Sequence, residues 1–340
     1  MTNRVIRIAE LPKGALSPEH FDLQSGVMPA PEKGEVLLRT LYMSIDAANR
    51  SWMQGATYRE AVKAGDPMPT YALCEVVESK SDRLATGDLV ACESSWSDFI
   101  TRPARLCQKL PRTEQLSHLM SIYGIAGKTA FHGLVSVGRP IAGETVLVSA
   151  AAGSVGIYVG QIAKALGCRV VGIAGGPEKC AWVVDELGFD ACIDYRDPGM
   201  FKALRAACPN GVDVYFDNVG GQILETALFV MNERGRVVCC GAISQYDTES
   251  VTGPRNLPGL VVVKRLRMEG FIVMDFAHQD KTAIRALQTW VAQGKIKVVE
   301  DIVEGLENAP AALIGLLAGD NKGKRLVHVA NPQGPAGAGN

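Results

Sequence analysis

The sequence predicts an α/β protein with two domains, a mostly β domain followed by a doubly wound parallel-sheet domain. Short alternating apolar runs, broken by Gly and Pro, fill the chain from residue 1 to about residue 119. From about residue 123, apolar strands alternate with helical patterns, a rhythm typical of a parallel sheet covered by helices. A chain of 340 residues also exceeds what one hydrophobic core usually serves.

Three strands are expected in the first half, each bounded by turn-forming residues. They are residues 34–46 (GEVLLRTLYMSID), 71–79 (YALCEVVES) and 87–94 (GDLVACES). We expect them to form a compact barrel-like core.

The second half alternates strand and helix patterns. Strands are expected at 145–150, 169–175, 191–195, 212–219 and 235–242, and helices at 154–166, 177–187, 198–207, 220–231 and 277–293. Gly167 and Gly188 follow two of these helices, where glycine commonly ends a helix. The expected domains are 1–122, completed by about 306–331, and 123–305, with a low-complexity tail at 332–340 that we expect to be disordered.

Composition narrows the class of protein. Apolar residues make up 47% and charged residues 21%, and the net charge is −1, which argues against a nucleic-acid binder. The N-terminus lacks the apolar core of a signal peptide, and no apolar run of about 18 residues is present, so we expect a cytoplasmic protein that binds no membrane. The nine cysteines include no C-x-x-C pair, which favours reduced, buried thiols.

The run VLVSAAAGSVG, residues 146–156, predicts a dinucleotide-binding turn. A strand leads into a small-residue loop and then a helix, as in the G-x-G-x-x-G fingerprint, but Ala151 replaces the first glycine, at the tight turn. Gly153 lets the backbone approach a pyrophosphate, Gly156 lets helix and strand pack closely, and the helix N-terminus offers N–H groups to phosphate. A purely structural loop is the alternative.

The acid that an NAD site uses about 20 residues further on is absent. The second strand ends instead in Ala174, Gly175 and Gly176, and Lys179 follows one helical turn later. A lysine there can meet a 2′-phosphate by charge, whereas a solvated surface lysine is the alternative and Glu178 is a counter-signal. The pattern favours NADP(H) over NAD(H).

Several motifs together resemble one family. They are VLLRTLYMSID followed by Arg50, GIAGKTAFHGL (124–134), VSAAAGSVG, FDNVGG (216–221), CGAISQY (240–246), KRLRMEGFIV (264–273) and NKGKRLV (321–327). The chain resembles the zinc-free medium-chain dehydrogenase/reductases, in the branch of the NADPH-dependent double-bond reductases. This branch includes prostaglandin, alkenal and curcumin reductases. The resemblance covers nearly the whole chain and implies a GroES-like β-barrel domain, a Rossmann domain and a C-terminal return to the first domain.

The resemblance also implies roles for individual residues. The implied NADP(H)-binding residues are Ala152, Gly153, Val155 and Gly156 at the pyrophosphate; Gly175, Lys179 and Tyr195 at the 2′-phosphate; Asn218 in the cofactor cleft; Thr129 near the phosphates or nicotinamide; Gly241, Ile243 and Tyr246 beside the nicotinamide ribose; Phe271 and Val273 at the carboxamide; and Asn321 from the returning segment.

Each implied role has a structural alternative. Tyr195 could be a half-buried aromatic at a strand end, Asn218 a helix cap, Thr129 a packing residue and Phe271 a core aromatic. One departure concerns the substrate, because Ala47 and Ala48 stand where relatives commonly have Pro-Tyr. The family is also often dimeric through its Rossmann sheets, and the apolar run at 266–275 is compatible with an edge strand that pairs.

No metal site is expected. The first-domain positions of the zinc ligands read Ser44-Ile45-Asp46 and Leu73-Cys74-Glu75, without the Cys and His that catalytic zinc needs. None of the five histidines stands in a ligand spacing, and His132 and His278 are interpreted as ordinary helix residues.

Without a Lewis acid, the favoured chemistry is hydride transfer to a conjugated carbon. Attack at the β-carbon of an α,β-unsaturated ketone or aldehyde gives an enolate, which hydrogen-bond donors stabilise and an acid protonates at the α-carbon. Tyr246 is the first candidate donor, although it could hold the ribose only and water could donate; Tyr58, expected on a first-domain loop, is the second. A zinc-free quinone reductase and a non-catalytic NADPH-binding protein are the alternative functions.

Overall fold

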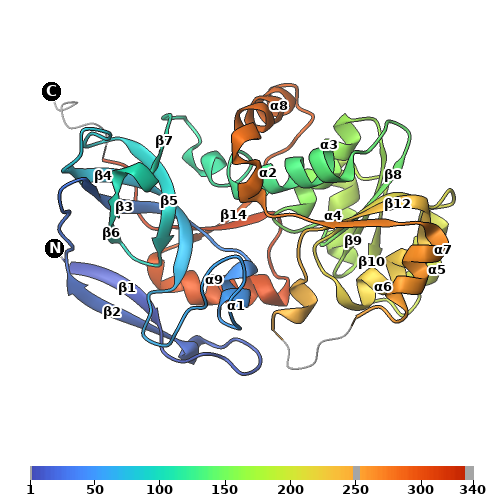
Figure 1. The fold of residues 1–340 in the computed structure, drawn as a ribbon, viewed down its shortest axis with the longest axis horizontal. Helices are drawn as coiled ribbons and strands as arrows, with labels where there is room; N and C mark the ends of the chain where they lie inside the picture. The colour runs from blue at the N-terminus through green and yellow to red at the C-terminus, as the bar shows by residue number, and fades with distance from the viewer. Residues whose placement is uncertain (1, 248–252, 334–340) are drawn as a thin grey trace. The chain divides into compact units, whose positions relative to one another are not determined.

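The computed structural model describes residues 2–247 and 253–333, which form two compact units (Figure 1). The first unit contains residues 2–120, 300–320 and 325–333; the second contains the described residues from 121 to 299 together with 321–324. These limits differ by a few residues from the expected ones, and the return of 321–324 to the second unit was not expected. Residues 334–340 of the expected disordered tail lie outside the described residues.

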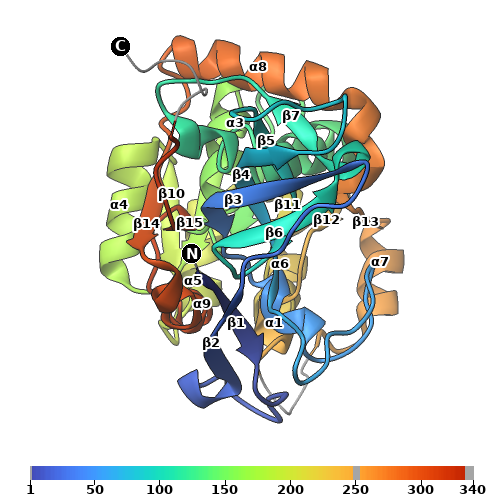
Figure 2. The ribbon, with the colours of Figure 1, turned by 90° about the vertical axis from the view of Figure 1, so that its left-hand side faces the viewer.

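The first unit is built on a seven-stranded sheet. Its strands are β3 (Glu35–Ser44), β4 (Pro69–Ser79), β5 (Leu89–Ser95), β6 (Phe99–Pro103), β7 (Gln108–Leu110), β14 (Glu300–Glu304) and β15 (Lys324–His328). The order is β14-β15-β3-β4-β5-β7, with β6 also on β3, and Figure 2 shows β3, β4 and β5 crossing this unit. Leu41, Leu73, Leu89 and Leu326 join in its core.

The remaining elements of the first unit are short. They are the antiparallel pair β1 (Thr2–Ile8) and β2 (Phe21–Val27), the helices α1 (Ala48–Trp52) and α9 (Ala309–Ala318), and the 3-10 turns η1 (Pro18–His20), η2 (Ala104–Leu106), η3 (Leu116–Leu119) and η7 (Leu306–Asn308). The three strands predicted in this half are confirmed as β3, β4 and β5, with ends shifted by a few residues.

The second unit contains a six-stranded parallel sheet. Its strands are β8 (Thr145–Ser149), β9 (Arg169–Ala174), β10 (Ala191–Asp194), β11 (Val212–Asp217), β12 (Met231–Cys239) and β13 (Arg267–Gly270), in the order β10-β9-β8-β11-β12-β13. The described pairs are parallel. This is the strand order of a dinucleotide-binding doubly wound sheet, which reverses between the first and fourth strands.

Helices cover both faces of this sheet. One face packs against α2 (Ile125–Phe131), α3 (Gly156–Ala165), α4 (Pro177–Leu187) and α8 (Asp280–Ala292), the other against α5 (Met200–Ala207), α6 (Gly221–Val230) and α7 (Leu257–Lys264) (Figure 1). Within β8, Val146 and Val148 face the first group and Leu147 the second. A strand buried on both faces has to be apolar throughout, which explains the unbroken run that predicted it.

Three helix predictions need correction at their starts. The helix expected from 154 begins at Gly156, and the one expected from 198 begins at Met200. Just before Met200, Asp197 forms a local turn by accepting the Gly199 N–H at 2.6 Å. The long helix expected at 277–293 is α8, preceded by the 3-10 turn η6 (Val273–Gln279). The π-helical turn η4 (His132–Gly138), which continues α2, and the short 3-10 turn η5 (Ile243–Gln245) were not predicted.

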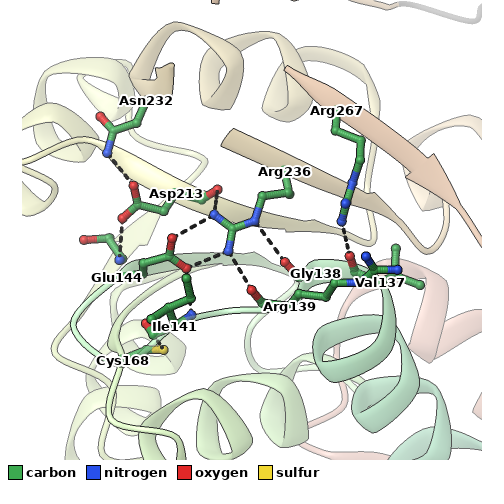
Figure 3. A network of polar contacts seen from close by, with 11 residues as sticks. Val137, Gly138, Arg139, Ile141, Glu144, Cys168, Asp213, Asn232, Arg236 and Arg267 are labelled. Atoms are coloured by element: carbon green, nitrogen blue, oxygen red, sulfur yellow. Dashed lines mark hydrogen bonds and ion pairs between the residues drawn. The ribbon is translucent and has the colours of Figure 1, made fainter. Parts of the chain in front are cut away.

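A charged network fastens the amino-terminal edge of the parallel sheet (Figure 3). Arg236 in β12 forms an ion pair with Glu144 at 2.6 Å and donates to the carbonyls of Gly138 and Arg139 at 3.0 and 2.8 Å. Against the effect of burial, the guanidinium and the Ile141 N–H lower the pKa of Glu144. This fold binds its ligands at the opposite, carboxyl-terminal edge.

No helix of the described residues is long and apolar enough to span a membrane. The cytoplasmic location expected from the sequence stays a prediction.

Candidate cofactor site

The loop between β8 and α3 has the tight geometry that its small residues predict. A Cβ at Gly156 would lie 2.2 Å from the carbonyl oxygen of Ala150, so this close approach requires glycine. At Gly153 the same distance is 3.2 Å. The left-handed residue of the turn is Ala150, with φ 49°, which corrects the expectation that Ala151 holds the tight turn.

The returning C-terminal segment lies against this loop. The Gly323 N–H donates to the carbonyl oxygen of Ala152 at 2.9 Å, and Gly323 forms a parallel bridge with Gly153. With φ 80° and the Val299 carbonyl 2.5 Å from where its Cβ would stand, Gly323 has to be glycine. Val155 immediately precedes α3, and a helix N-terminus at this point suits the negative charge of a pyrophosphate.

The ends of β9 and β10 form a second group of predicted residues. A Cβ at Gly175 would lie 3.0 Å from the ring of Tyr195. Asp194 joins the two strand ends, because its Oδ1 accepts the N–H groups of Gly176 at 2.8 Å and Arg196 at 2.9 Å. Tyr195 is 44% exposed, so part of its ring is accessible, and its contact with the 2′-phosphate stays a prediction.

Lys179, expected at the 2′-phosphate, and Asn321, expected to close the site from the returning segment, are in contact. Lys179 Nζ donates to the backbone carbonyl of Asn321 at 2.6 Å, and Asn321 Nδ2 donates to Gly323 O at 2.8 Å. Glu178, the counter-signal to a phosphate site, is paired with Lys322 at 2.6 Å. That hydrogen bond lowers the pKa of Glu178, so its charge is compensated locally.

The FDNVGG turn after β11 is held by buried hydrogen bonds. Asn218 donates from its backbone N–H to Ser149 Oγ at 2.9 Å and from Nδ2 to Ser149 O at 2.8 Å. Asp217 accepts from Tyr215 OH at 2.7 Å and from the Gly220 N–H at 2.9 Å. Burial nevertheless raises the pKa of Asp217. Asn218 therefore fastens β11 to β8 at the edge where their carboxyl ends meet.

The CGAISQY segment folds back onto the same turn. The N–H groups of Gly241 and Ile243 donate to Asp217 O and Asn218 O, each at 3.2 Å. Tyr246 OH accepts the N–H of Ala242 at 3.1 Å, which leaves its own proton available to donate. Burial raises the pKa of the neighbouring Cys240 thiol to about 12, so this cysteine is protonated at neutral pH.

The remaining predicted residues lie elsewhere in this unit. Phe271 and Val273 follow β13, the last strand of the sheet, and Thr129 lies in α2. The Phe271 ring packs where a Cβ at Gly133 would stand, at 2.6 Å, and lies 6.4 Å from the Phe216 ring. Its side chain is thus part of the core, while the backbone after β13 is the part assigned to the carboxamide. Val273 begins η6, and Thr129 is buried within α2.

Comparisons with known proteins agree with this geometry. Residues 4–110 match the family model described as the N-terminal domain of oxidoreductase, and residues 154–289 match the one described as zinc-binding dehydrogenase. The NADPH-dependent curcumin reductase of Escherichia coli is 41% identical over 335 residues, covering 96% of this chain and 97% of that protein. The 2-alkenal reductase (NADP(+)-dependent) of Nicotiana tabacum is 40% identical over 309 residues, with 89% and 90% covered.

A solved structure extends the likeness to three dimensions. CurA from Vibrio vulnificus in complex with NADPH is 38% identical, with a TM-score of 0.92 over 97% of this chain and 100% of that one. The chain belongs to the medium-chain dehydrogenase/reductases. It is an NADP-dependent oxidoreductase of their double-bond reductase branch, and its two units have the fold predicted from the sequence, a GroES-like β domain and a Rossmann domain.

One predicted residue of this reductase lies in the GroES-like unit. Tyr58 is 52% exposed, and its ring makes an edge contact with Trp52 at 6.4 Å. Ala47 and Ala48, which replace the family's Pro-Tyr, begin α1. The catalytic role of Tyr58 stays a prediction.

The prediction that this reductase has no metal site rested on residues of the same unit. Glu75 is buried and accepts from Arg39 at 2.8 Å and Arg112 at 2.9 Å. Across residues 2–247 and 253–333, His, Cys, Asp and Glu side chains form no group of three that could hold a metal ion.

Sequence reasoning missed the acids that shape this reductase's cofactor turns. Asp217 and Asp194 each end a strand and accept from backbone N–H groups of the following loop, and Asp194 also accepts from the Gly176 N–H in the turn after β9. Their signal was available, because an acid directly after an apolar strand is well placed to organise the next turn. Ser149, which accepts two hydrogen bonds from Asn218, lies within the predicted dinucleotide-binding turn, but no role was predicted for it.

Proposed function

We propose that this oxidoreductase reduces the C=C bond of α,β-unsaturated ketones and aldehydes with NADPH. Hydride goes to the β-carbon and a proton to the α-carbon, so the substrate gains two hydrogens while NADPH becomes NADP⁺. The observation that carries the proposal is the tight loop at Gly153 and Gly156, together with the contact between Lys179 and Asn321. The chain is also about 40% identical to curcumin and alkenal reductases.

The residues fit a dinucleotide phosphate. The loop gives the close backbone approach that a pyrophosphate needs, and the 3.2 Å distance at Gly153 means that a side chain there would fill the cradle. Lys179 and Tyr195 would hold the 2′-phosphate end, and Asn321 would close the site from the returning segment. Asn218, Gly241, Ile243 and Tyr246 would hold the nicotinamide ribose, with the backbone at Phe271 and Val273 beside the carboxamide and Thr129 nearby. When bound, NADPH supplies the hydride.

The chain's own contribution is to position the substrate and to stabilise negative charge. Reduction of an enone places charge on the carbonyl oxygen, and a preorganised donor stabilises that charge more in the transition state than in the ground state. The Tyr246 hydroxyl is oriented by the Ala242 N–H, which uses one of its acceptor positions and leaves its proton to donate. Tyr246 is therefore assigned as the donor to the enolate oxygen, with water as the other source of the α-proton.

The activity is tested with purified full-length protein, NADPH and a panel of enones, enals and quinones. We expect NADPH oxidation with enones and enals and a saturated carbonyl product by mass spectrometry. Faster turnover of quinones than of any enone would replace the proposal with a quinone reductase. Tight NADPH binding without turnover of any substrate would indicate a non-catalytic protein.

We also propose a homodimer joined through β13. This strand is the last of the parallel sheet, so one of its edges has no partner strand within the described part of the chain. Pairing with a second copy is one way to satisfy such an edge. Light scattering of the purified protein should give twice the monomer mass, and a monomer at micromolar concentration would reject this assembly.

A further inference from the structure

Arg196 lies at the adenosine end of the assigned cofactor site and has no role in the arrangement above. It follows Tyr195 directly after β10, and its Nη1 would be 3.8 Å from a Cβ built on Gly176. Its guanidinium also lies 5.7 Å above the Tyr195 ring. The side chain thus returns from the end of β10 toward the turn that ends β9.

The backbone fixes this placement. Asp194 Oδ1 accepts both the Gly176 N–H and the Arg196 N–H, at 2.8 and 2.9 Å, so one carboxylate holds the two turns together. Gly176 has φ 89°, a conformation that side-chain-bearing residues rarely adopt. Arg196 is therefore presented by a defined turn, although its side chain is exposed.

The other charged side chains near Arg196 already have hydrogen-bond or ion-pair partners. Lys322 is paired with Glu178, and Lys179 donates to Asn321 O. The nearest acids in sequence are also engaged, Asp194 by the two N–H groups and Asp197 by the Gly199 N–H at 2.6 Å. Within the described residues, the guanidinium of Arg196 has neither an ion pair nor a hydrogen bond, only its contact with the Tyr195 ring.

We propose that Arg196 is a specificity-determining residue that binds the 2′-phosphate of NADPH together with Lys179. The inference rests on the proposed cofactor site. Arginine suits this position because its planar fork can hold two phosphate oxygens and stack on an aromatic ring at once. An arginine beside the turn where NAD enzymes carry an acid is also a general solution for the 2′-phosphate.

The test compares nucleotide affinities of full-length variants without any enone, so that failure of the proposed reaction does not affect it. Dissociation constants for NADPH, NADH and 2′,5′-ADP are measured by fluorescence or calorimetry at two salt concentrations. For Arg196→Gln we expect the NADPH and 2′,5′-ADP constants to rise about tenfold, as for loss of one charged hydrogen bond. The NADH constant should change less than twofold, and Arg196→Lys should retain part of the affinity.

Arg205→Gln is the matched control. Arg205 is an exposed arginine in α5 that lies 5.9 Å above the Phe201 ring, so it repeats the arginine–aromatic pairing at a different place. It should leave all three constants unchanged. An NADPH to NADH ratio that is the same in Arg196→Gln as in the wild type, with unchanged thermal unfolding, would overturn the assignment. Equal weakening of NADPH and NADH would also overturn it.

Discussion

Lys179 and Asn321 are joined by a hydrogen bond of 2.6 Å from the lysine Nζ to the asparagine backbone carbonyl. The two residues are 142 positions apart in the sequence. The contact fixes the ammonium group at the point where α4 meets the returning segment 321–324, which itself bridges to the cofactor loop. The hydrogen bond holds the ammonium group of Lys179 in place, and its predicted role at the 2′-phosphate is tested below.

Lys179→Met should weaken NADPH binding roughly 10- to 100-fold, because a charged hydrogen bond to phosphate is lost. NADH binding should change much less, since NADH lacks the 2′-phosphate. Lys164→Met is the control, because Lys164 pairs with Asp190 at 2.9 Å on the exposed surface. Titration with both nucleotides measures the effect, and equal losses for NADPH and NADH in Lys179→Met would contradict the role.

Gly153→Ala and Gly156→Ala should separate cofactor binding from folding. At Gly156 the new Cβ would meet a backbone oxygen at 2.2 Å, so we expect destabilisation of about 1–3 kcal/mol. At Gly153 the 3.2 Å contact is tolerable, and the expected effect is at least a tenfold weaker NADPH affinity with near-normal stability. Urea unfolding and NADPH titration distinguish the two, and a Gly153→Ala protein with wild-type affinity would refute the cradle.

Tyr246→Phe should lower kcat for enones about 10- to 100-fold if its hydroxyl donates to the developing enolate. Removal of the hydroxyl leaves the Ala242 N–H without its acceptor, so a stability measurement is needed beside the kinetics. Tyr58→Phe in the same assay tests the second candidate. If Tyr246→Phe turns over enones as fast as the wild type, the donor assignment fails, while the reductase proposal stands with water as proton source.

The buried His132 should make the stability of the Rossmann unit sensitive to acid. It is completely buried in the Rossmann unit, stacks on Phe276 at 4.9 Å, and its Nε2 is 3.6 Å from Asp280 Oδ1, too far for a hydrogen bond. Burial lowers the pKa of His132, against the attraction of Asp280 and with further lowering from Lys128 and His278.

The direction of the pH effect on stability follows from proton binding by the folded and unfolded chains. The unfolded chain binds the histidine proton near pH 6.5, whereas the folded chain binds it only at lower pH, so stability decreases as pH falls through about 6.5. His132→Phe keeps an aromatic ring against Phe276 and should flatten the loss of unfolding free energy between pH 7.5 and 5.5. His20→Gln, which removes a histidine of the GroES-like unit instead, is the control. Parallel pH profiles for His132→Phe and wild type would show that another group is responsible.

Local patterns predicted much of the fold and of the cofactor loop. The helix at 177–187 was predicted to the residue, because Pro177 suits a first helical turn and Gly188 ends the helix with φ 72°. The apolar run of β8 and the glycines at 153 and 156 could be interpreted correctly because they are consecutive in one βαβ unit. The preference of this chain for NADP(H) over NAD(H) was predicted from the missing acid near Ala174.

What could not be predicted depends on distant contacts. The bonds from Lys179 to Asn321 and from Gly323 to Ala152 join segments more than a hundred residues apart, and no local pattern encodes them. The π-helical turn at His132 reflects packing of Gly133 against Phe216 and Phe271. The strand β2 was missed because most of its residues are exposed, so it lacks an apolar alternation.

Transfer of deuterium from NADPH labelled at C4 to a simple enone such as 4-phenyl-3-buten-2-one tests the central claim most directly. Both C4 epimers of the labelled cofactor are used, so that the face of transfer does not matter. We predict a saturated ketone with one deuterium at the β-carbon from one epimer, and none there from solvent D₂O. An allylic alcohol deuterated at the carbonyl carbon, or no product despite bound NADPH, would contradict C=C reduction.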